Sequence, residues 1–170
     1  MFEIVKYGNE VLSKKAEEVT VFDASFASFV NGLFETLDAS DSGIGLAAPQ
    51  VGVSKALFVV SLPEEGIRQV FVNPQIVETT VETSPYSEGC LSFPGIYEDV
   101  IRPAGVTVQA QDAEGKPFSL KADGIYARVI LHEYDHLIGK MFIDRLSETD
   151  RQRAVARYEK LNKRKGKKKK

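Results

Sequence analysis

The chain has 170 residues, of which 43% are hydrophobic and 27% charged, both ordinary fractions for a globular protein. This composition excludes a fibrous or wholly disordered chain, and we expect a single catalytic domain over residues 1–162. No apolar run approaches the roughly 20 residues of a membrane span, and no secretory signal is visible. The single cysteine allows no internal disulfide, which is typical of a reducing, cytoplasmic setting. We expect a cytoplasmic protein without membrane contact, and we also expect a monomer.

The first predicted helix covers residues 24–39, where apolar side chains recur at helical spacing along one face. Asp23 is a suitable N-cap for this helix. The next segment, residues 41–52, contains glycines and a proline and is predicted to be a loop. The apolar face of the helix predicts core packing, not a ligand site.

Short β-strands are predicted in the middle of the chain, where segments rich in β-branched or aromatic residues alternate with prolines and glycines. The expected strands are residues 56–62, 69–72, 76–83, 96–102, 106–112 and 118–121. A hairpin connection is predicted at residues 112–116, between the last two strands.

Two more helices are predicted after the strands. One covers residues 124–137, with Asp123 as its N-cap and Gly139 just past its end, and the other begins near Ser147. This order of elements predicts an α+β fold, with mainly antiparallel sheets packed around the helix at residues 124–137 and a C-terminal helix.

The helix at residues 124–137 carries the only two histidines of the chain, His132 and His136. Their spacing of four places both imidazoles on one helix face, close enough to hold one cation. Glu133 follows the first histidine, as does the carboxylate that acts as general base toward a metal-activated water. The motif predicts a metal-dependent hydrolase, although an ordinary amphipathic helix is the alternative. Asp135 is either a surface acid or a support for a ligand or a nearby loop.

A catalytic site of this kind needs a third protein ligand. Asp144 and Glu148 lie downstream, and Cys90 is the only cysteine. Its thiolate suits a borderline-soft divalent metal, and its surroundings are rich in turn residues, which favours a side chain directed into a site. A lone cysteine is more often a small buried hydrophobe, so the residues alone leave these alternatives open.

Three segments together resemble the signature motifs of the peptide deformylase family, and in particular its bacterial type. They are Gly43-Ile44-Gly45-Leu46-Ala47-Ala48-Pro49-Gln50, Glu88-Gly89-Cys90-Leu91-Ser92 and His132-Glu133-Tyr134-Asp135-His136. Their order and separation match that family over nearly the whole chain, to about residue 150. The basic C-terminus is not part of the pattern.

The resemblance implies a metal-dependent hydrolase that removes the N-formyl group from the N-terminal methionine of newly made polypeptides and releases formate. It implies Fe²⁺ as the native ion, with Zn²⁺, Ni²⁺ or Co²⁺ able to substitute, and a sensitivity to oxidation. The implied residues are Cys90, His132 and His136 as metal ligands, Glu133 as acid and base, and Gln50 with the backbone N–H of Leu91 as donors to the oxyanion.

The glycine segment has two alternative interpretations. Residues 43–48 also fit the G-x-G-x-x-A fingerprint of dinucleotide sites. That fingerprint should follow a strand and open a helix, whereas this segment follows a helix and meets a proline, which disfavours a cofactor. We expect instead that an extended peptide pairs with the backbone at Ile44 and Gly45. For Gln50, a role that only stabilises the loop is the alternative.

A methionine side chain requires an apolar pocket. Ile125, Arg128 and Val129 share the helix face of His132, because they precede it by seven, four and three positions. Arg128 is expected at the pocket mouth, and core packing is the alternative for the other two. The remaining expected substrate-binding residues are Ile44, Gly45, Tyr86 and Gly89.

Residues 163–170 contain seven of the 22 lysines and arginines and no acid, whereas the rest of the chain is acidic. Such a block predicts a solvated, disordered tail. A second interpretation is contact of the C-terminal helix and tail with ribosomal RNA, because clustered cations bind phosphates.

The sequence also allows two rival functions. A metallopeptidase would use the same helix motif with a third ligand downstream and would not require a formyl group. A catalytically silent ribosome- or RNA-binding module would carry an incomplete metal site, yet every motif residue is present here.

Overall fold

The structure is a computed structural model that describes the backbone of residues 1–168 and the side chains of residues 1–164. It contains three α-helices, seven strands and four short 3₁₀ helices within these residues. In chain order they are η1 (Glu10–Ser13), α1 (Ala24–Asp38), β1 (Gly45–Ala47), η2 (Ala48–Val51), β2 (Leu57–Leu62), η3 (Pro63–Glu65), β3 (Ile67–Thr79), β4 (Thr83–Cys90), β5 (Phe93–Pro103), β6 (Gly105–Gln111), β7 (Pro117–Asp123), α2 (Gly124–Leu137), η4 (Phe142–Arg145) and α3 (Glu148–Lys168).

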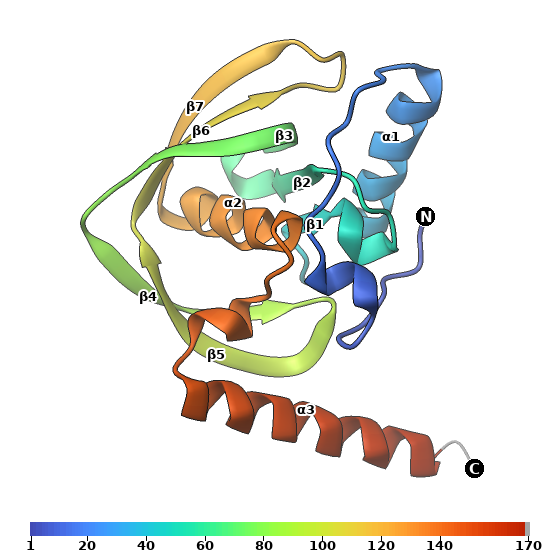
Figure 1. Cartoon of the computed structure of the whole chain (residues 1–170), viewed down its shortest axis with the longest axis vertical. Coiled ribbons are helices and arrows are strands. Elements are labelled where there is room, and N and C mark those ends of the chain that lie inside the picture. Colours follow the sequence, from blue (N-terminus) through green and yellow to red (C-terminus); the bar gives the residue numbers. More distant parts are fainter. Residues whose placement is uncertain (169–170) are drawn as a thin grey trace.

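Helix α2 lies at the centre of the molecule, between two antiparallel sheets (Figure 1). The larger sheet has the strand order β1-β2-β3-β6-β7, and the smaller one is the β4–β5 hairpin. Helix α1 packs beside β1 and β2, and α3 runs along β5 at the other end of the molecule. The predicted α+β fold around a central helix is confirmed.

The core consists of three apolar clusters that hold these layers together. The first fills the space between α2 and the larger sheet and includes Phe58, Phe71 and Ile130. The second lies under α1, and the third joins β5 to η4 and α3 through residues such as Phe93 and Tyr158. Burial of each such side chain contributes roughly 1.5–3 kcal/mol, and the first cluster holds α2 against the larger sheet.

The helix predictions agree closely with the structure. Helix α1 begins after Asp23, whose side chain accepts a hydrogen bond from the backbone N–H of Phe26 at 2.8 Å. Helix α2 covers the predicted residues and is followed by Gly139 with a φ of 74°, a left-handed conformation that favours glycine. Asp123 occupies the N-cap position but makes no side-chain capping bond.

The strand predictions needed correction at three places. The predicted strand 69–72 and the first half of the predicted strand 76–83 form one strand, β3, with an irregular register near Asn73, which has a φ of 48°. Residues 80–82 are not in a strand, and Thr83 begins β4. Strand β1 lies in the segment predicted to be a loop, and residues 84–90 of β4 were not predicted as a strand. Strand β4 contains few β-favouring residues and forms because its backbone pairs with β5, which is tertiary context overriding propensity.

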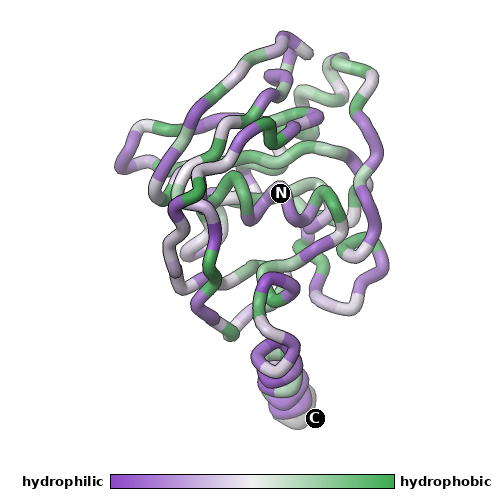
Figure 2. The backbone as a smooth tube through the Cα atoms, turned by 60° about the vertical axis from the view of Figure 1, so that its left-hand side comes forward, coloured by the Kyte–Doolittle hydropathy of each residue, from purple (hydrophilic) through white to green (hydrophobic). Residues whose placement is uncertain are grey.

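The C-terminal basic segment also differs from the prediction. Helix α3 continues to Lys168, so residues 163–168 are helical and not a disordered tail. Lysine and arginine are good helix formers, and positive charge is favourable near a helix C-terminus. Residues 169–170 lie outside the described residues. Figure 2 shows that α3 is largely hydrophilic, and no helix within residues 1–168 is long and apolar enough to cross a membrane.

Candidate active site

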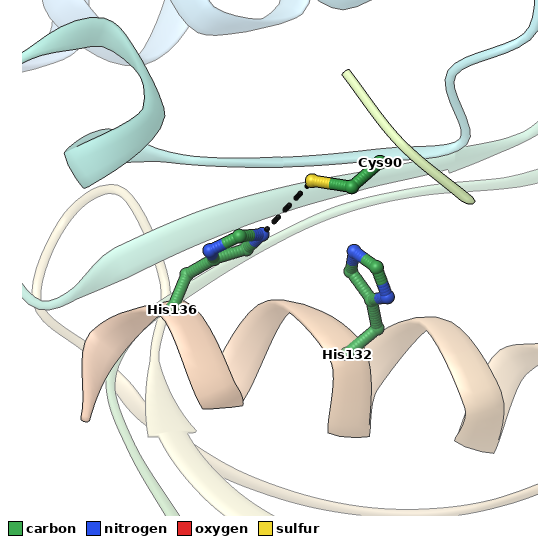
Figure 3. Close-up of side chains that lie close together, drawn as sticks. All are labelled: Cys90, His132 and His136. Carbon is green, nitrogen blue, oxygen red and sulfur yellow. Dashed lines mark hydrogen bonds between the residues drawn. The ribbon is translucent and has the colours of Figure 1, made fainter. Parts of the chain in front are cut away.

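The two histidines of α2 point from one helix face toward the end of β4 (Figure 3). Their ring centroids are 5.3 Å apart, as the spacing of four residues predicts. Packing of α2 between two sheets buries His136 completely and leaves His132 only slightly exposed. The helix therefore presents two rigidly held imidazoles to a single point.

Cys90 is the last residue of β4 and lies opposite the two histidines. Its Sγ is 3.4 Å from Nε2 of His136, and the ligand atoms of Cys90, His132 and His136 all lie within 4.8 Å of one another. One sulfur and two imidazole nitrogens at this separation fit the donor set of a single divalent ion such as Zn²⁺ or Fe²⁺. The alternatives Asp144 and Glu148 are directed elsewhere, since they bond to Arg151 and Gln152.

The thiol of Cys90 lies in a strongly cationic environment. Burial raises its pKa, but the charge of His136 and hydrogen bonds from both histidines outweigh that effect and lower the pKa to about 5. Gln50 Nε2 also donates to Sγ at 3.4 Å. The lowered pKa favours the thiolate, which is the form that binds a metal.

His132 is oriented by a buried carboxylate that sequence analysis did not single out. Its Nδ1 lies 2.7 Å from Oε1 of Glu88, and a carboxylate at neutral pH can only accept, so Nδ1–H donates. This bond leaves Nε2 free to face the metal position. Burial works against the charge of Glu88, yet hydrogen bonds from His132 and Arg102 lower its pKa to about 2.

Glu88 belongs to a buried ionic network behind the candidate metal site. Arg102 donates through Nε and Nη2 to Glu88 and through Nη1 to Asp135, at 2.7–3.0 Å. Arg145 in η4 donates to the same Asp135 at 2.6 and 3.0 Å. Asp135 is thus a buried, doubly paired acid that supports a nearby loop, which is one of its two predicted roles. Glu88 is the first residue of the cysteine motif, two residues before Cys90, but only the fold reveals its partners.

Glu133 lies next to His132 and is 3% exposed. Burial is the main reason that its pKa is raised to about 7, against the opposing charges of His132 and His136. Among the described residues, its Oε2 has no hydrogen-bond partner. A buried carboxylate with a free oxygen and a pKa near neutrality suits the acceptance and later release of one proton.

Gln50 reaches the site from η2, directly after β1. Its Oε1 accepts from the backbone N–H of Ala47 at 2.9 Å, so the side chain does hold its own loop. Its Nε2 is directed toward Cys90 and also donates to Oγ of Ser92 at 3.3 Å. The two predicted roles of Gln50, stabilisation of its loop and donation to an oxyanion, are therefore compatible with each other.

A cavity of about 430 Å³ opens onto these residues. Every predicted substrate-binding residue lines it: Ile44, Gly45, Tyr86, Gly89, Ile125, Arg128 and Val129. Gln50, Cys90, Leu91, His132 and Glu133 line it as well. Tyr97, which sequence analysis missed, covers Gly89, where an added Cβ would lie 2.5 Å from its ring.

The prediction that Arg128 lies at the mouth of the pocket is wrong. Arg128 is 5% exposed, and its guanidinium bonds to Glu88 at 2.9 Å and to the carbonyl oxygens of Val100 and Ser84. A charged group that faced an apolar pocket without partners would carry a large desolvation cost. The guanidinium is instead directed into the buried network, so Arg128 forms part of the pocket wall.

Comparisons with known proteins agree with this arrangement. A model of the polypeptide deformylase family matches residues 1–152. The peptide deformylase of Chromobacterium violaceum is 46% identical over 164 residues, which cover 96% of this chain and 97% of that protein. A crystal structure of a peptide deformylase from Legionella pneumophila has a TM-score of 0.89 at 39% identity and covers 98% of both chains. The chain therefore belongs to the polypeptide deformylase family and is a hydrolase that removes N-formyl groups from nascent peptides.

Proposed function

We propose that Cys90, His132 and His136 hold one divalent metal ion, with Fe²⁺ as the native ion and Zn²⁺, Ni²⁺ or Co²⁺ able to substitute. The observation that carries this proposal is the meeting of one thiolate and two imidazoles within 4.8 Å beside a buried acid. When bound, such an ion lowers the pKa of water and polarises a carbonyl oxygen. Anaerobic purification followed by elemental analysis tests both the occupancy and the identity of the ion.

Glu133 is the proposed general base and acid. Its free oxygen accepts a proton from the attacking water, and its pKa of about 7 allows the same proton to pass to the departing amine of methionine. The formyl C–N bond breaks, and the products are formate and a peptide with a free amino terminus. The two proton transfers need only one carboxylate because they occur in succession.

Gln50 and Leu91 are the proposed donors to the oxyanion. The side-chain N–H₂ of Gln50 already points toward Cys90, and Leu91 follows Cys90 directly at the wall of the cavity. Donors held in place before the reaction stabilise developing charge without reorganisation. This assignment would place the formyl oxygen between the two loops that carry these residues.

The methionine side chain is proposed to enter the cavity between Ile44, Tyr86, Ile125 and Val129, with Arg128 as part of the wall. Gly45 and Gly89 also line the cavity, and an extended peptide is proposed to pair with the backbone there. A direct test compares turnover of a formyl-Met peptide with that of the same peptide without the formyl group. A metallopeptidase would cleave the unformylated peptide, whereas the proposed enzyme would release formate only from the first.

We further propose a cytoplasmic monomer that works on chains still attached to the ribosome. One chain supplies every residue of the candidate site. Helix α3 exposes Arg153, Lys160, Lys163 and Arg164, which suit contact with the phosphates of ribosomal RNA. Ribosome pelleting with residues 163–170 deleted tests this contact, and unchanged binding would refute the contribution of that segment.

A further inference from the structure

The N-terminal segment, residues 2–7, crosses two loops that belong to different sheets. Gln50 lies in η2, which follows β1 of the larger sheet. Leu91 and Ser92 form the turn between β4 and β5 of the smaller sheet. The distance between the proposed oxyanion donors therefore depends on how these two sheets are held relative to each other.

Consecutive residues of the N-terminal segment bond to both loops. The backbone N–H of Val5 donates to the carbonyl oxygen of Gln50 at 2.9 Å. The backbone N–H of Tyr7 donates to the carbonyl oxygen of Ser92 at 2.8 Å. Between them, Nζ of Lys6 donates to the carbonyl oxygen of Leu91 at 2.9 Å. Three successive residues thus connect the backbone on both sides of the oxyanion position.

The segment is anchored in the core at both ends, so it can serve as a rigid connection. Phe2 donates its backbone N–H to Oγ1 of Thr36 at 2.7 Å, and its ring packs on α1 against Phe29. The ring of Tyr7 makes edge contacts with Phe93 and Tyr158, with centroids 5.1 and 5.7 Å away. Because both ends of the segment are fixed in the core, its hydrogen bonds hold the two loops in a fixed position.

We propose that Lys6 is a positioning residue for the reaction, which holds Leu91 at the correct separation from Gln50 while Val5 and Tyr7 hold the backbone on either side. The inference rests on the proposed role of Gln50 and Leu91 as oxyanion donors. Such donors act only within about 2.7–3.1 Å of the developing charge, and a displacement of about 1 Å can cost up to about a hundredfold in rate. Lys6 lines the same cavity, but its ammonium group is bonded to protein backbone.

Lys6 is exposed, and this allows its effect on catalysis to be separated from its effect on folding. Exposed polar contacts contribute little to global stability. We expect Lys6→Met, which keeps the aliphatic stem but removes the donor, to lower kcat roughly fivefold to tenfold because the Leu91 loop is displaced. The KM for a formyl-Met peptide and the urea midpoint of unfolding should stay unchanged.

The experiment measures kcat and KM of the metal-loaded enzyme with a formyl-Met tripeptide. Lys6→Arg retains a donor of similar reach and should restore at least half of the lost kcat. Lys15→Met is the matched control, because Lys15 is an exposed lysine of the same N-terminal region that does not line the cavity. Its kinetics should equal those of the unmodified enzyme.

Three results would overturn the proposal: a kcat for Lys6→Met equal to that of the Lys15→Met control, a rise in KM with unchanged kcat, or an equal loss in Lys6→Arg. A rise in KM alone would mean that Lys6 contacts the substrate. Gln50→Ala, measured in parallel, separates the oxyanion role of Gln50 from the positioning role of Lys6. Full activity of Gln50→Ala would refute the proposed oxyanion role itself, whereas loss in Gln50→Ala with no effect at Lys6 refutes only the positioning role.

Discussion

Arg102 connects the two carboxylates of the buried ionic network behind the candidate metal site. It is 4% exposed and bonds two buried carboxylates, Glu88 and Asp135. Replacement by methionine preserves the aliphatic stem and removes all three charged hydrogen bonds. Each carboxylate then retains only one arginine, Arg128 for Glu88 and Arg145 for Asp135.

The expected cost follows from this geometry. Removal of one partner from a buried ion pair typically costs about 3–5 kcal/mol, because the remaining charge stays buried. The retained arginines reduce the penalty on each carboxylate, but two carboxylates are affected together. We therefore expect Arg102→Met to lower the free energy of unfolding by about 3–5 kcal/mol, a large share of the stability of an ordinary domain.

The assay is urea unfolding of the metal-loaded protein, followed by far-ultraviolet circular dichroism at a constant excess of metal. Arg68→Met is the matched control, because Arg68 makes a two-bond pair with Asp38 in which both side chains are 50% exposed. Arg68→Met should lower the free energy of unfolding by only about 1 kcal/mol. The reasoning would be refuted if Arg102→Met destabilised the protein no more than Arg68→Met does.

Three further outcomes test the site itself. Glu133→Gln should keep the metal but lose at least about a hundredfold in turnover of a formyl-Met peptide, since the amide cannot accept the proton, and near-normal turnover would exclude the general-base role. Cys90→Ser should lower the metal content after dialysis because a hydroxyl is a poorer ligand than a thiolate, and full occupancy would place the third ligand elsewhere. Gly45→Ala would place a Cβ 2.6 Å from Oε1 of Glu133 and 2.8 Å from Cγ1 of Val129, so kcat should fall at least about tenfold, whereas an unchanged kcat would show that Glu133 tolerates displacement.

The helices and the candidate metal ligands on α2 were the most predictable parts of this protein. The signals for α1 and α2 are local: apolar periodicity and the capping Asp23 mark α1, and the glycine stop at Gly139 marks the end of α2. His132 and His136 share a face as a direct result of helical geometry. Cys90 required the family resemblance, because its turn-rich surroundings favour a site residue but do not exclude Asp144 or Glu148 as the third ligand.

Sequence patterns failed where pairing partners decide the structure. No strand was predicted over residues 84–90, and only pairing with the backbone of β5 makes this segment a strand. The misplacement of Arg128 has the same origin. Its position on α2 was correct, but the direction of its guanidinium depends on Glu88 and Ser84, which lie about 40 residues earlier in the chain.

The sequence by itself determined the elements whose information is local: the central helix, its two histidines with Glu133, and the reaction class that this spacing implies. Tertiary structure alone decided which distant groups surround them. Glu88 and Arg102 orient His132 from behind, and the N-terminal segment bonds the loops of Gln50 and Leu91. These contacts join residues far apart in the chain, and their hydrogen bonds become strong and specific only after folding has removed water from the site.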